Sequence, residues 1–537
     1  MKKLIRKIKH HIQAHPKVSE LVFLILIFLI SLAIRRIGLK HGFPLLTHPD
    51  EGAIIDPVLN MTRLHTLNSG NFNRPDQVLQ YLNLIVLNLF SYIKYGQNVY
   101  FTFSEHYLDF YYYSRLIISV MGSLIPIAAY KIGKEIKPRI ALPSALIFAF
   151  FPLFAKHALI ITPDVPITLF TMLVITFALR YLNTNKEKFL IIATVFVAVN
   201  TAEKYPGLLS FTIILVAIGL QIFIKNKGNT PHPFRAFLLH SAKMALIFLV
   251  TLFIIAPYLF LDYSSVIEAL VRESRSTHLG ADNLGWLGNL WFYAQTFYAY
   301  VGLLGVILFL VGLFAFLKRF TMQNILILYG FFYWIALSAL ALHWERWALP
   351  MYITPLFLIA IGSGFLLEKK DKYSVGINLI GGIFISLFLI QQSVYTLYIP
   401  IQKKFTDTRV ISTEYCDLAG VTRDNSIYEG YTPLEPSLPT KLFDNFYEQV
   451  PNKDYIILSS TIYDRYFAEP DRYQDSIDIY NEIRHSFPLI KQYIPSPYEE
   501  GTLGQVENIL YFIKFRLGLT DEVRYSGPTI EIYQIVH

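Results

Sequence analysis

The sequence is poor in cysteine and in charge. Its 537 residues include a single cysteine, Cys416, and only 16% are Asp, Glu, Lys or Arg, against about 25% in a typical soluble globular domain. One cysteine cannot form an internal disulfide, and it excludes a cysteine-rich metal site. Disorder is also excluded, because it requires high charge together with low hydrophobicity.

Motifs that bind nucleotides or zinc are missing as well. No Walker loop, Rossmann fingerprint or zinc motif occurs in a convincing context. The lack of a Walker loop argues against a primary pump driven by ATP.

Hydrophobic residues are abundant instead. They make up 54% of the chain, with 15% aromatic residues, and the mean hydropathy is +0.42. The net charge of +8 would indicate nucleic acid in a soluble protein. In a membrane protein it has a simpler cause, because basic residues accumulate in cytoplasmic loops. We therefore predict a membrane protein with lipids and no nucleic acid among its partners.

The N-terminus predicts an uncleaved first helix. A basic start, MKKLIRKIKHHIQAHPK, precedes the apolar run 18–34, as in a signal peptide. The run is about as long as a bilayer-spanning helix requires, and Arg35 and Arg36 stand where a cleavage site would need small residues. We expect this helix to start in the cytoplasm.

Apolar runs predict about eleven spanning helices by their length. They cover residues 18–34, 114–130, 140–154, 165–181, 189–201, 206–224, 241–260, 299–317, 325–342, 350–367 and 375–397. With this count, most basic loop residues fall on the side of the N-terminus, as the positive-inside bias requires. These residues are Lys131, Lys134, Lys137, Arg139, Arg180, Lys186, Lys188, Lys225, Lys227, Arg235, Lys243, Lys318, Arg319, Lys369, Lys370 and Lys372.

Two further regions complete the organisation. Residues 38–113 form an external first loop, in which 79–94 has the spacing of a helix lying in the membrane interface. Residues 1–397 are then a transmembrane module, and an odd number of spans places 398–537 outside. In this second region, residues 455–458 and 529–535 have the pattern of strands. The apolar residues of 476–484 fit neither the helical nor the strand period. We predict a small α/β extracytoplasmic domain.

Charged residues gather at the external helix ends, where they are costly without a purpose. The first group is His48-Pro49-Asp50-Glu51. Its carboxylates could act as a general base or bind a metal. Alternatively, Asp50 caps a helix that begins near Glu51.

Two more groups follow along the chain. Asp164, which comes after Lys156-His157, either caps the fourth span or faces the same cavity as Asp50. Lys204 lies in a short turn, where its ammonium either reaches the headgroups or contacts a lipid phosphate.

The last group is His343-Trp344-Glu345-Arg346-Trp347. Arg346 has the geometry to bind a phosphate with two hydrogen bonds, or it pairs with a nearby carboxylate. The two tryptophans are interpreted as interface anchors rather than sugar platforms.

Taken in order, these motifs make the chain resemble the GT-C class of glycosyltransferases. The nearest likeness is to family 39 and related enzymes, namely protein O-mannosyltransferases, bacterial aminoarabinose transferases and Rgt-type transferases. The matching motifs are His48-Pro49-Asp50-Glu51, Ser114-Arg115-Leu116, Tyr130-Lys131-Ile132-Gly133, Thr162-Pro163-Asp164, Lys204-Tyr205-Pro206-Gly207, Arg346 before Leu349-Pro350, and Gly527-Pro528-Thr529-Ile530-Glu531-Ile532-Tyr533. The proline-rich step that the family carries after the first loop helix is reduced here to Arg74-Pro75-Asp76.

The resemblance implies a GT-C fold and an inverting transfer of a hexose or pentose from a polyprenyl-phosphate donor. It makes Asp50 the base that deprotonates an acceptor hydroxyl. Lys204 and Arg346 would bind the donor phosphate, whose negative charge grows as it leaves. Glu51 and Asp164 would orient the acceptor or, with Asp50, hold a divalent cation. His48, His157 and His343 are expected to support the site.

Other functions are compatible with parts of the pattern. A transporter or flippase would use intramembrane charges along its path, but here the charges lie at helix ends and no inverted repeat is evident. A lipid-A or glycan ligase would also act outside. A scaffold would need no carboxylates at the membrane edge. The acceptor (a lipid, glycan or protein) and the sugar stay open. We expect the chain in the cell (plasma or inner) membrane.

Overall fold

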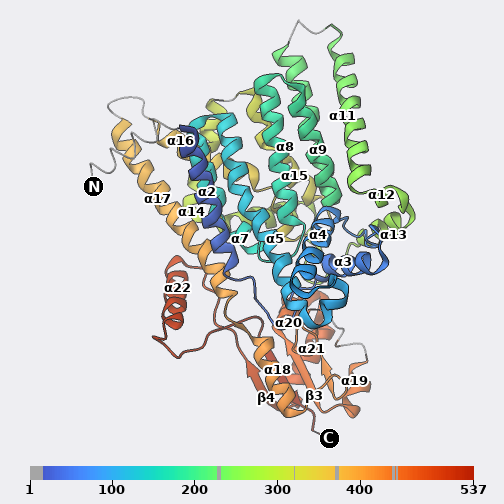
Figure 1. Ribbon diagram of the computed structural model, residues 1–537. Helices are drawn as coiled ribbons and strands as arrows, with labels where there is room; N and C mark the ends of the chain where they lie inside the picture. The colour runs from blue at the N-terminus through green and yellow to red at the C-terminus, as the bar shows by residue number, and fades with distance from the viewer. Residues whose placement is uncertain are drawn as a thin grey trace.

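The computed structural model describes residues 16–226, 231–319, 321–368, 374–437, 442 and 445–536. The basic residues before Pro16, together with Lys227, Lys369, Lys370 and Lys372, lie outside this range. Figure 1 shows a helical bundle with a smaller mixed domain at one end, which we call the domain end; α2 begins at the opposite, far end.

Long apolar helices build the bundle, and seven of those described could cross a membrane by length and composition. They are α2 (Pro16–Arg36), α5 (Val99–Ile136), α8 (Asp164–Thr184), the continuous run of η1 (Tyr205–Ser210), α10 (Phe211–Gly219) and η2 (Leu220–Lys225), α11 (Pro233–Ile255), α14 (Gly285–Lys318) and α17 (Ser374–Gln402).

Shorter helices occupy the remaining expected spans. They are α6 (Pro138–Ala149), α9 (Glu187–Glu203), α15 (Tyr329–Ser338) after η3 (Met322–Leu328), and α16 (Ile353–Leu366). Each of the predicted spanning runs thus falls on a helix, and the prediction of a polytopic α-helical membrane protein is confirmed.

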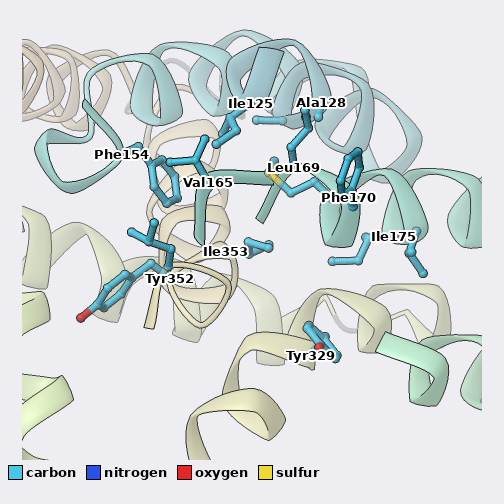
Figure 2. Packing of buried hydrophobic residues seen from close by; sticks show 14 of the residues in the cluster. Ile125, Ala128, Phe154, Val165, Leu169, Phe170, Ile175, Tyr329, Tyr352 and Ile353 are labelled. Carbon is cyan, nitrogen blue, oxygen red and sulfur yellow. The ribbon is translucent and has the colours of Figure 1, made fainter. Parts of the chain in front are cut away.

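The core of the bundle is apolar and closely packed. Side chains from α5, α8 and α16, including Ile125, Val165, Leu169 and Ile353, meet in one buried layer (Figure 2). Where α14 crosses α16, a Cβ on Gly312 would overlap the carbonyl oxygen of Leu358. Small residues at such crossings let helix backbones approach closely, as is common in membrane bundles.

The first loop folds into helices at the domain end (Figure 1). Its elements are α3 (Gly52–Leu64), α4 (Gln77–Tyr95) and the first turns of α5. The polar positions of α4, such as Gln80 and Asn83, are buried, whereas its apolar side chains Ile85, Leu89 and Ile93 are exposed. This helix therefore presents its apolar face outward, which suits contact with lipid at the interface.

The C-terminal region is a mixed domain, as predicted. Its main sheet has the order β2-β3-β6-β4, in which β2 and β3 are parallel and β6 is antiparallel to both of its neighbours. The expected strands are β3 (Tyr455–Ser459) and β6 (Ile530–Gln534), and the ambiguous stretch 476–484 lies in helix α21 (Pro470–Ser486). The other elements are β1 (Thr406–Asp407), α18 (Thr408–Ala419), β2 (Ser426–Tyr428), α19 (Phe446–Gln449), α20 (Ser460–Phe467), β4 (Leu489–Tyr493), α22 (Thr502–Arg516) and β5 (Tyr525–Ser526).

Loops at the domain end hold this domain against the bundle. Residues 262–286, which include α13 (Tyr263–Glu273), reach it through Asp282, whose carboxylate pairs with Arg472 at 2.5 Å. Arg409 of the domain donates a hydrogen bond to the carbonyl of Thr47 at 3.3 Å. The domain thereby contacts the segment that carries His48 and Asp50.

Candidate functional site

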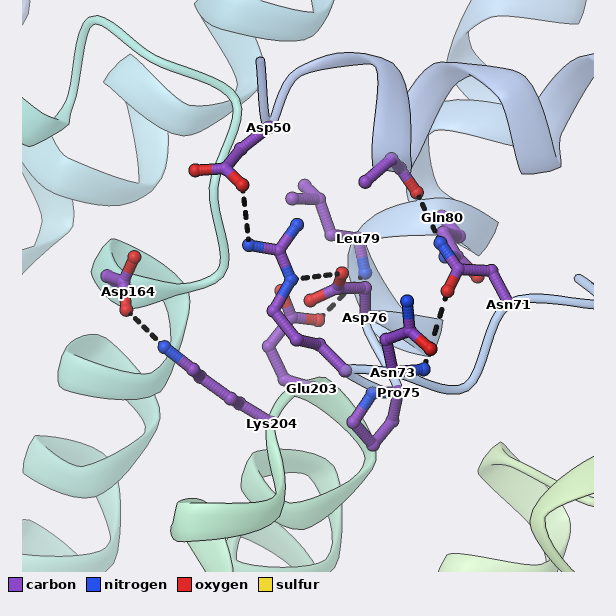
Figure 3. Close-up of polar contacts among 12 residues, drawn as sticks. Asp50, Asn71, Asn73, Pro75, Asp76, Leu79, Gln80, Asp164, Glu203 and Lys204 are labelled. Atoms are coloured by element: carbon purple, nitrogen blue, oxygen red, sulfur yellow. Dashed lines mark hydrogen bonds and ion pairs between the residues drawn. The ribbon is translucent and has the colours of Figure 1, made fainter. Parts of the chain in front are cut away.

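Four separate turns converge at the domain end of the bundle. Asp50 lies between α2 and α3, Asp164 begins α8, Lys204 joins α9 to η1, and Arg346 lies in η4 (Glu345–Ala348). Figure 3 shows Asp50, Asp164 and Lys204 facing one another across this junction. We call these four residues, together with Arg74, the charged cluster.

Asp50 sits between two arginines. Arg346 pairs with one carboxylate oxygen and Arg74 with the other, the latter at 3.4 Å. The Asp50 side chain keeps 25% of its surface exposed, so part of it stays accessible. Burial would raise the pKa of Asp50, but the two guanidinium groups more than offset this and hold it below its usual range. The carboxylate is therefore ionised.

Asp164 links the other two cations. Its Oδ1 accepts a hydrogen bond from Lys204 Nζ at 2.6 Å, and its Oδ2 lies 3.8 Å from Arg346 Nε. The Lys204 ammonium also lies 5.4 Å from the centre of the Trp347 ring. Burial lowers the pKa of Lys204, although the Asp164 carboxylate partly compensates. Lys204 and Asp164 thus form a buried ion pair, in which removal of either charge would leave the other uncompensated.

Neither aspartate is a helix cap. The N-cap of α3 is Glu51 and that of α8 is Pro163, and neither helix has a side-chain hydrogen bond at its N-cap. The capping alternatives considered from the sequence are therefore wrong for Asp50 and Asp164. Both carboxylates are used for ion pairs instead.

Arg74 belongs to the cluster although the sequence analysis did not select it. Its Nε pairs with Asp76 at 3.2 Å, and Asp76 in turn lies beside Glu203. The backbone amide of Asp76 donates to the Glu203 carbonyl at 2.9 Å, and the amide of Leu79 donates to the Glu203 carboxylate at 2.9 Å. Burial raises the pKa of Asp76 to about 6. The only signal in the sequence was the altered Arg74-Pro75-Asp76 step.

Glu51 points away from the charged cluster. Both of its oxygens accept hydrogen bonds from Arg115, at 2.8 and 2.7 Å, and the two side chains are fully buried. The amide of Ile161 donates to the same carboxylate at 3.2 Å. With these contacts, Glu51 ties the loop that carries Asp50 to α5.

The three histidines lie in different surroundings. Nδ1 of His48 accepts a hydrogen bond from the Asp50 amide at 3.3 Å, and burial lowers the pKa of His48 to about 4. Nε2 of His157 lies 3.4 Å from the Glu345 carboxylate. His343 packs against the Phe292 ring, with ring centres 4.6 Å apart. His48 thus shapes the Asp50 turn directly, whereas the other two are set apart from Asp50.

Glu345 lies at the centre of a second cluster of polar side chains beside Arg346. It accepts hydrogen bonds from Lys156 and from the Tyr300 hydroxyl, the latter at 3.0 Å. Burial would raise the pKa of Glu345, but His157 and Lys156 hold it below its usual range. This group fixes η4, and with it the backbone of Arg346.

The residues present do not fit a divalent cation. Within the described ranges, no three His, Cys, Asp or Glu side chains come together as metal ligands. Of the three carboxylates considered for this role, Glu51 is closed off by Arg115, while Asp50 and Asp164 each face cations.

With this geometry established, the chain can be compared with known proteins. The family described as dolichyl-phosphate-mannose-protein mannosyltransferase matches residues 113–261. The fold is that of the GT-C class, and the resemblance drawn from the motifs is confirmed at this level. The sequence matches no curated protein.

Two solved structures of ArnT from Cupriavidus metallidurans are similar to this chain. The apo structure has 12% sequence identity and a TM-score of 0.51, covering 88% of this chain and 96% of that one. The structure of that protein bound to undecaprenyl phosphate has 12% identity and a TM-score of 0.49, covering 97% and 98%.

Proposed function

We propose that the chain is a glycosyltransferase that moves a hexose or pentose from a polyprenyl-phosphate donor to an acceptor hydroxyl, with inversion. The observation that carries the proposal is the charged cluster, in which a partly exposed carboxylate, Asp50, pairs with Arg74 and Arg346. Through Asp164, which lies 3.8 Å from Arg346, the cluster also includes Lys204. A carboxylate beside several cations suits a reaction that removes one proton and releases one phosphate.

The family match supports a lipid-linked donor. Its description names dolichyl-phosphate-mannose, a sugar on a polyprenyl phosphate, and the matched residues 113–261 contain Asp164 and Lys204. The bundle also brings the cluster to the end of membrane-spanning helices, where the phosphate of a lipid lies. The sugar and the acceptor (a lipid, a glycan or a protein) are left open by this argument.

In the proposed reaction, Asp50 takes the proton of the acceptor hydroxyl as its oxygen attacks the anomeric carbon. The bond between that carbon and the phosphate oxygen breaks, and the electron pair leaves with the lipid phosphate. Arg346, Arg74 and Lys204 stabilise the charge that grows there. The sugar carbon passes through an oxocarbenium-like state, as in glycoside hydrolysis.

Binding of the donor would also change the pKa of Asp50, because the donor phosphate competes for the arginines that pair with this carboxylate. While Arg346 and Arg74 hold Asp50, its lowered pKa makes it a weak base. A donor phosphate carries oxygens that compete for the same guanidinium groups. Its binding would draw the arginines away and raise the pKa of Asp50, so that a strong base forms only when the donor is in place.

The charges also support an orientation for the chain. At the far end, Lys131 and Lys134 pair with Glu20 near the start of α2, while Arg139 and Arg319 pair with Glu368. A basic end of this kind belongs to the cytoplasm. We therefore assign the N-terminus to the cytoplasm, and the charged cluster and the C-terminal domain to the outer face of the cell membrane.

The test compares purified wild type with Asp50→Asn in detergent, using a panel of polyprenyl-phosphate sugars and candidate acceptors. We expect the variant to lose at least ~100-fold in release of lipid phosphate, the scale of general-base catalysis. Asp56→Asn is the matched control, since Asp56 is an exposed carboxylate on α3. Equal rates for wild type and Asp50→Asn would remove Asp50 from this role.

The same assay separates an enzyme from a transporter or flippase. In detergent there are no compartments, so a transporter would leave the donor chemically unchanged. Release of lipid phosphate that depends on the acceptor, by the wild type, identifies a transferase.

A further inference from the structure

Helix α22 carries an apolar stripe that is largely exposed, with only Val506 of its side chains partly buried. Leu503, Val506, Leu510, Ile513 and Leu517 follow one another at spacings of three and four, so they share one face of the helix. Leu503 is 87% exposed, and Leu517, at the end of the helix, is 68% exposed. Large apolar side chains grouped in this way mark an interaction surface.

The opposite face of α22 is docked on the membrane bundle. The Tyr511 ring packs edge-on against Phe405, with ring centres 5.7 Å apart, in a cluster that includes Ile401 and Ile37. Ile37 directly follows α2, and Ile401 lies in the last turn of α17. The helix is thus held where two spanning helices emerge at the domain end, as Figure 1 shows for α17.

A second helix at the same end repeats this pattern. On α4, the exposed side chains Leu82, Ile85, Leu89 and Ile93 are also spaced by three and four, while the polar positions face inward. Both α4 and α22 therefore expose apolar side chains near the ends of spanning helices. This shared position indicates that the lipid of one leaflet contacts both helices.

We propose that α22 is a membrane-interface helix whose stripe enters the leaflet at the domain end. The lipid-facing surface of α17, which exposes Leu387 and Ile390, leads along that helix to the cluster that holds α22. Amphipathic helices that lie in the interface bury their apolar face just below the headgroups. Since α22 carries Glu507 against Lys514 and Arg516, its net charge is only +1, and we expect its binding not to require anionic lipid.

This contact anchors the C-terminal domain to the membrane independently of its connection to α17. It goes beyond the proposed transfer reaction and does not depend on it, because the helix would enter the leaflet whatever chemistry the charged cluster performs.

The experiment places one fluorescent probe on the stripe. In a Cys416→Ser background, Leu510→Cys is labelled with an environment-sensitive dye, and the full chain is reconstituted in phosphatidylcholine nanodiscs. Leu418→Cys is the matched control, because Leu418 is an exposed leucine of the same domain, 90% accessible, on α18. The readout is quenching by lipids that carry a nitroxide near the start of the acyl chain.

We expect the dye at position 510 to lose roughly half of its fluorescence, the dye at 418 to be unaffected, and anionic lipid to change neither result. Leu517→Cys provides a second probe if the first variant does not fold. Unquenched dye at both 510 and 517 would overturn the proposal. Disulfide-linked dimers of Leu510→Cys would overturn it too, because they would assign the stripe to a second copy.

Discussion

The fully buried pair of Glu51 and Arg115 predicts a sharp difference between single and double variants. Arg115 donates to both oxygens of Glu51 and to the carbonyls of Leu39 and His41, at 2.7–2.9 Å. Removing one partner of such a buried pair costs about 3–5 kcal/mol, because the other charge is left uncompensated. We therefore expect Arg115→Met to lower the thermal stability strongly.

The double variant removes both charges at once. Glu51→Leu with Arg115→Met leaves the carbonyls of Leu39 and His41 unpaired, at about 1–3 kcal/mol each, but it buries no lone charge. Its loss should be clearly smaller than the sum of the two single losses, since residues in contact do not act additively. The assay is the fraction of monodisperse protein after heating in detergent, followed by transfer activity of the folded fraction.

These variants distinguish a positioning role of Glu51 from a chemical one. If Glu51 only fixes the turn that carries Asp50, transfer activity should fall together with stability, and the folded fraction of Glu51→Gln should keep most of it. If Glu51→Gln folds and melts like the wild type but is inactive, the positioning role is refuted, and Glu51 takes part in the reaction as its sequence motif led us to expect.

Further predictions concern other buried charges. Arg35 is fully buried and donates only to the Ser31 carbonyl among the described contacts, so Arg35→Met should melt at the same temperature as the wild type or higher. Burial raises the pKa of Glu429 to about 8 from 4.5. The stability that the protonated Glu429 side chain contributes is complete below 4.5 and is lost as pH rises through about 8. The melting temperatures of Glu429→Gln and wild type should therefore diverge over this pH window. The arginines hold the pKa of Asp50 below its usual 3.8, so the wild-type profile of kcat/KM should show no acid limb from this group above that value, whereas Arg346→Gln should move the limb upward.

The fold could be largely predicted from the sequence because spanning helices need long apolar runs. A helix at 79–94 was expected from its amphipathic spacing, and α4 occupies that position. What the pattern did not give was its orientation, because burial of Gln80 and Asn83 depends on neighbours in α3 and α5. A stripe identifies two faces of a helix, but only packing decides which one meets the lipid.

The candidate site was less accessible to prediction. Composition and turn position selected Asp50, Asp164, Lys204 and Arg346, and the structure brings these four together. Their partners could not be assigned, because Arg346 and Asp50 are 296 residues apart along the chain. Arg74 was missed since an arginine in a loop carries no local sign of its partner. The pairing of Glu51 with Arg115 could not be predicted either, because Arg115 lies 64 residues away.

Three of the four shorter helices in the bundle fall far below the thickness of a bilayer. With 12, 10 and 14 residues, α6, α15 and α16 reach about 15–21 Å, whereas the hydrocarbon layer measures about 30 Å. The segments that continue from them at the domain end carry Lys156, His343 and Arg346. Beside these helices, water and ions would therefore descend below the plane of the headgroups.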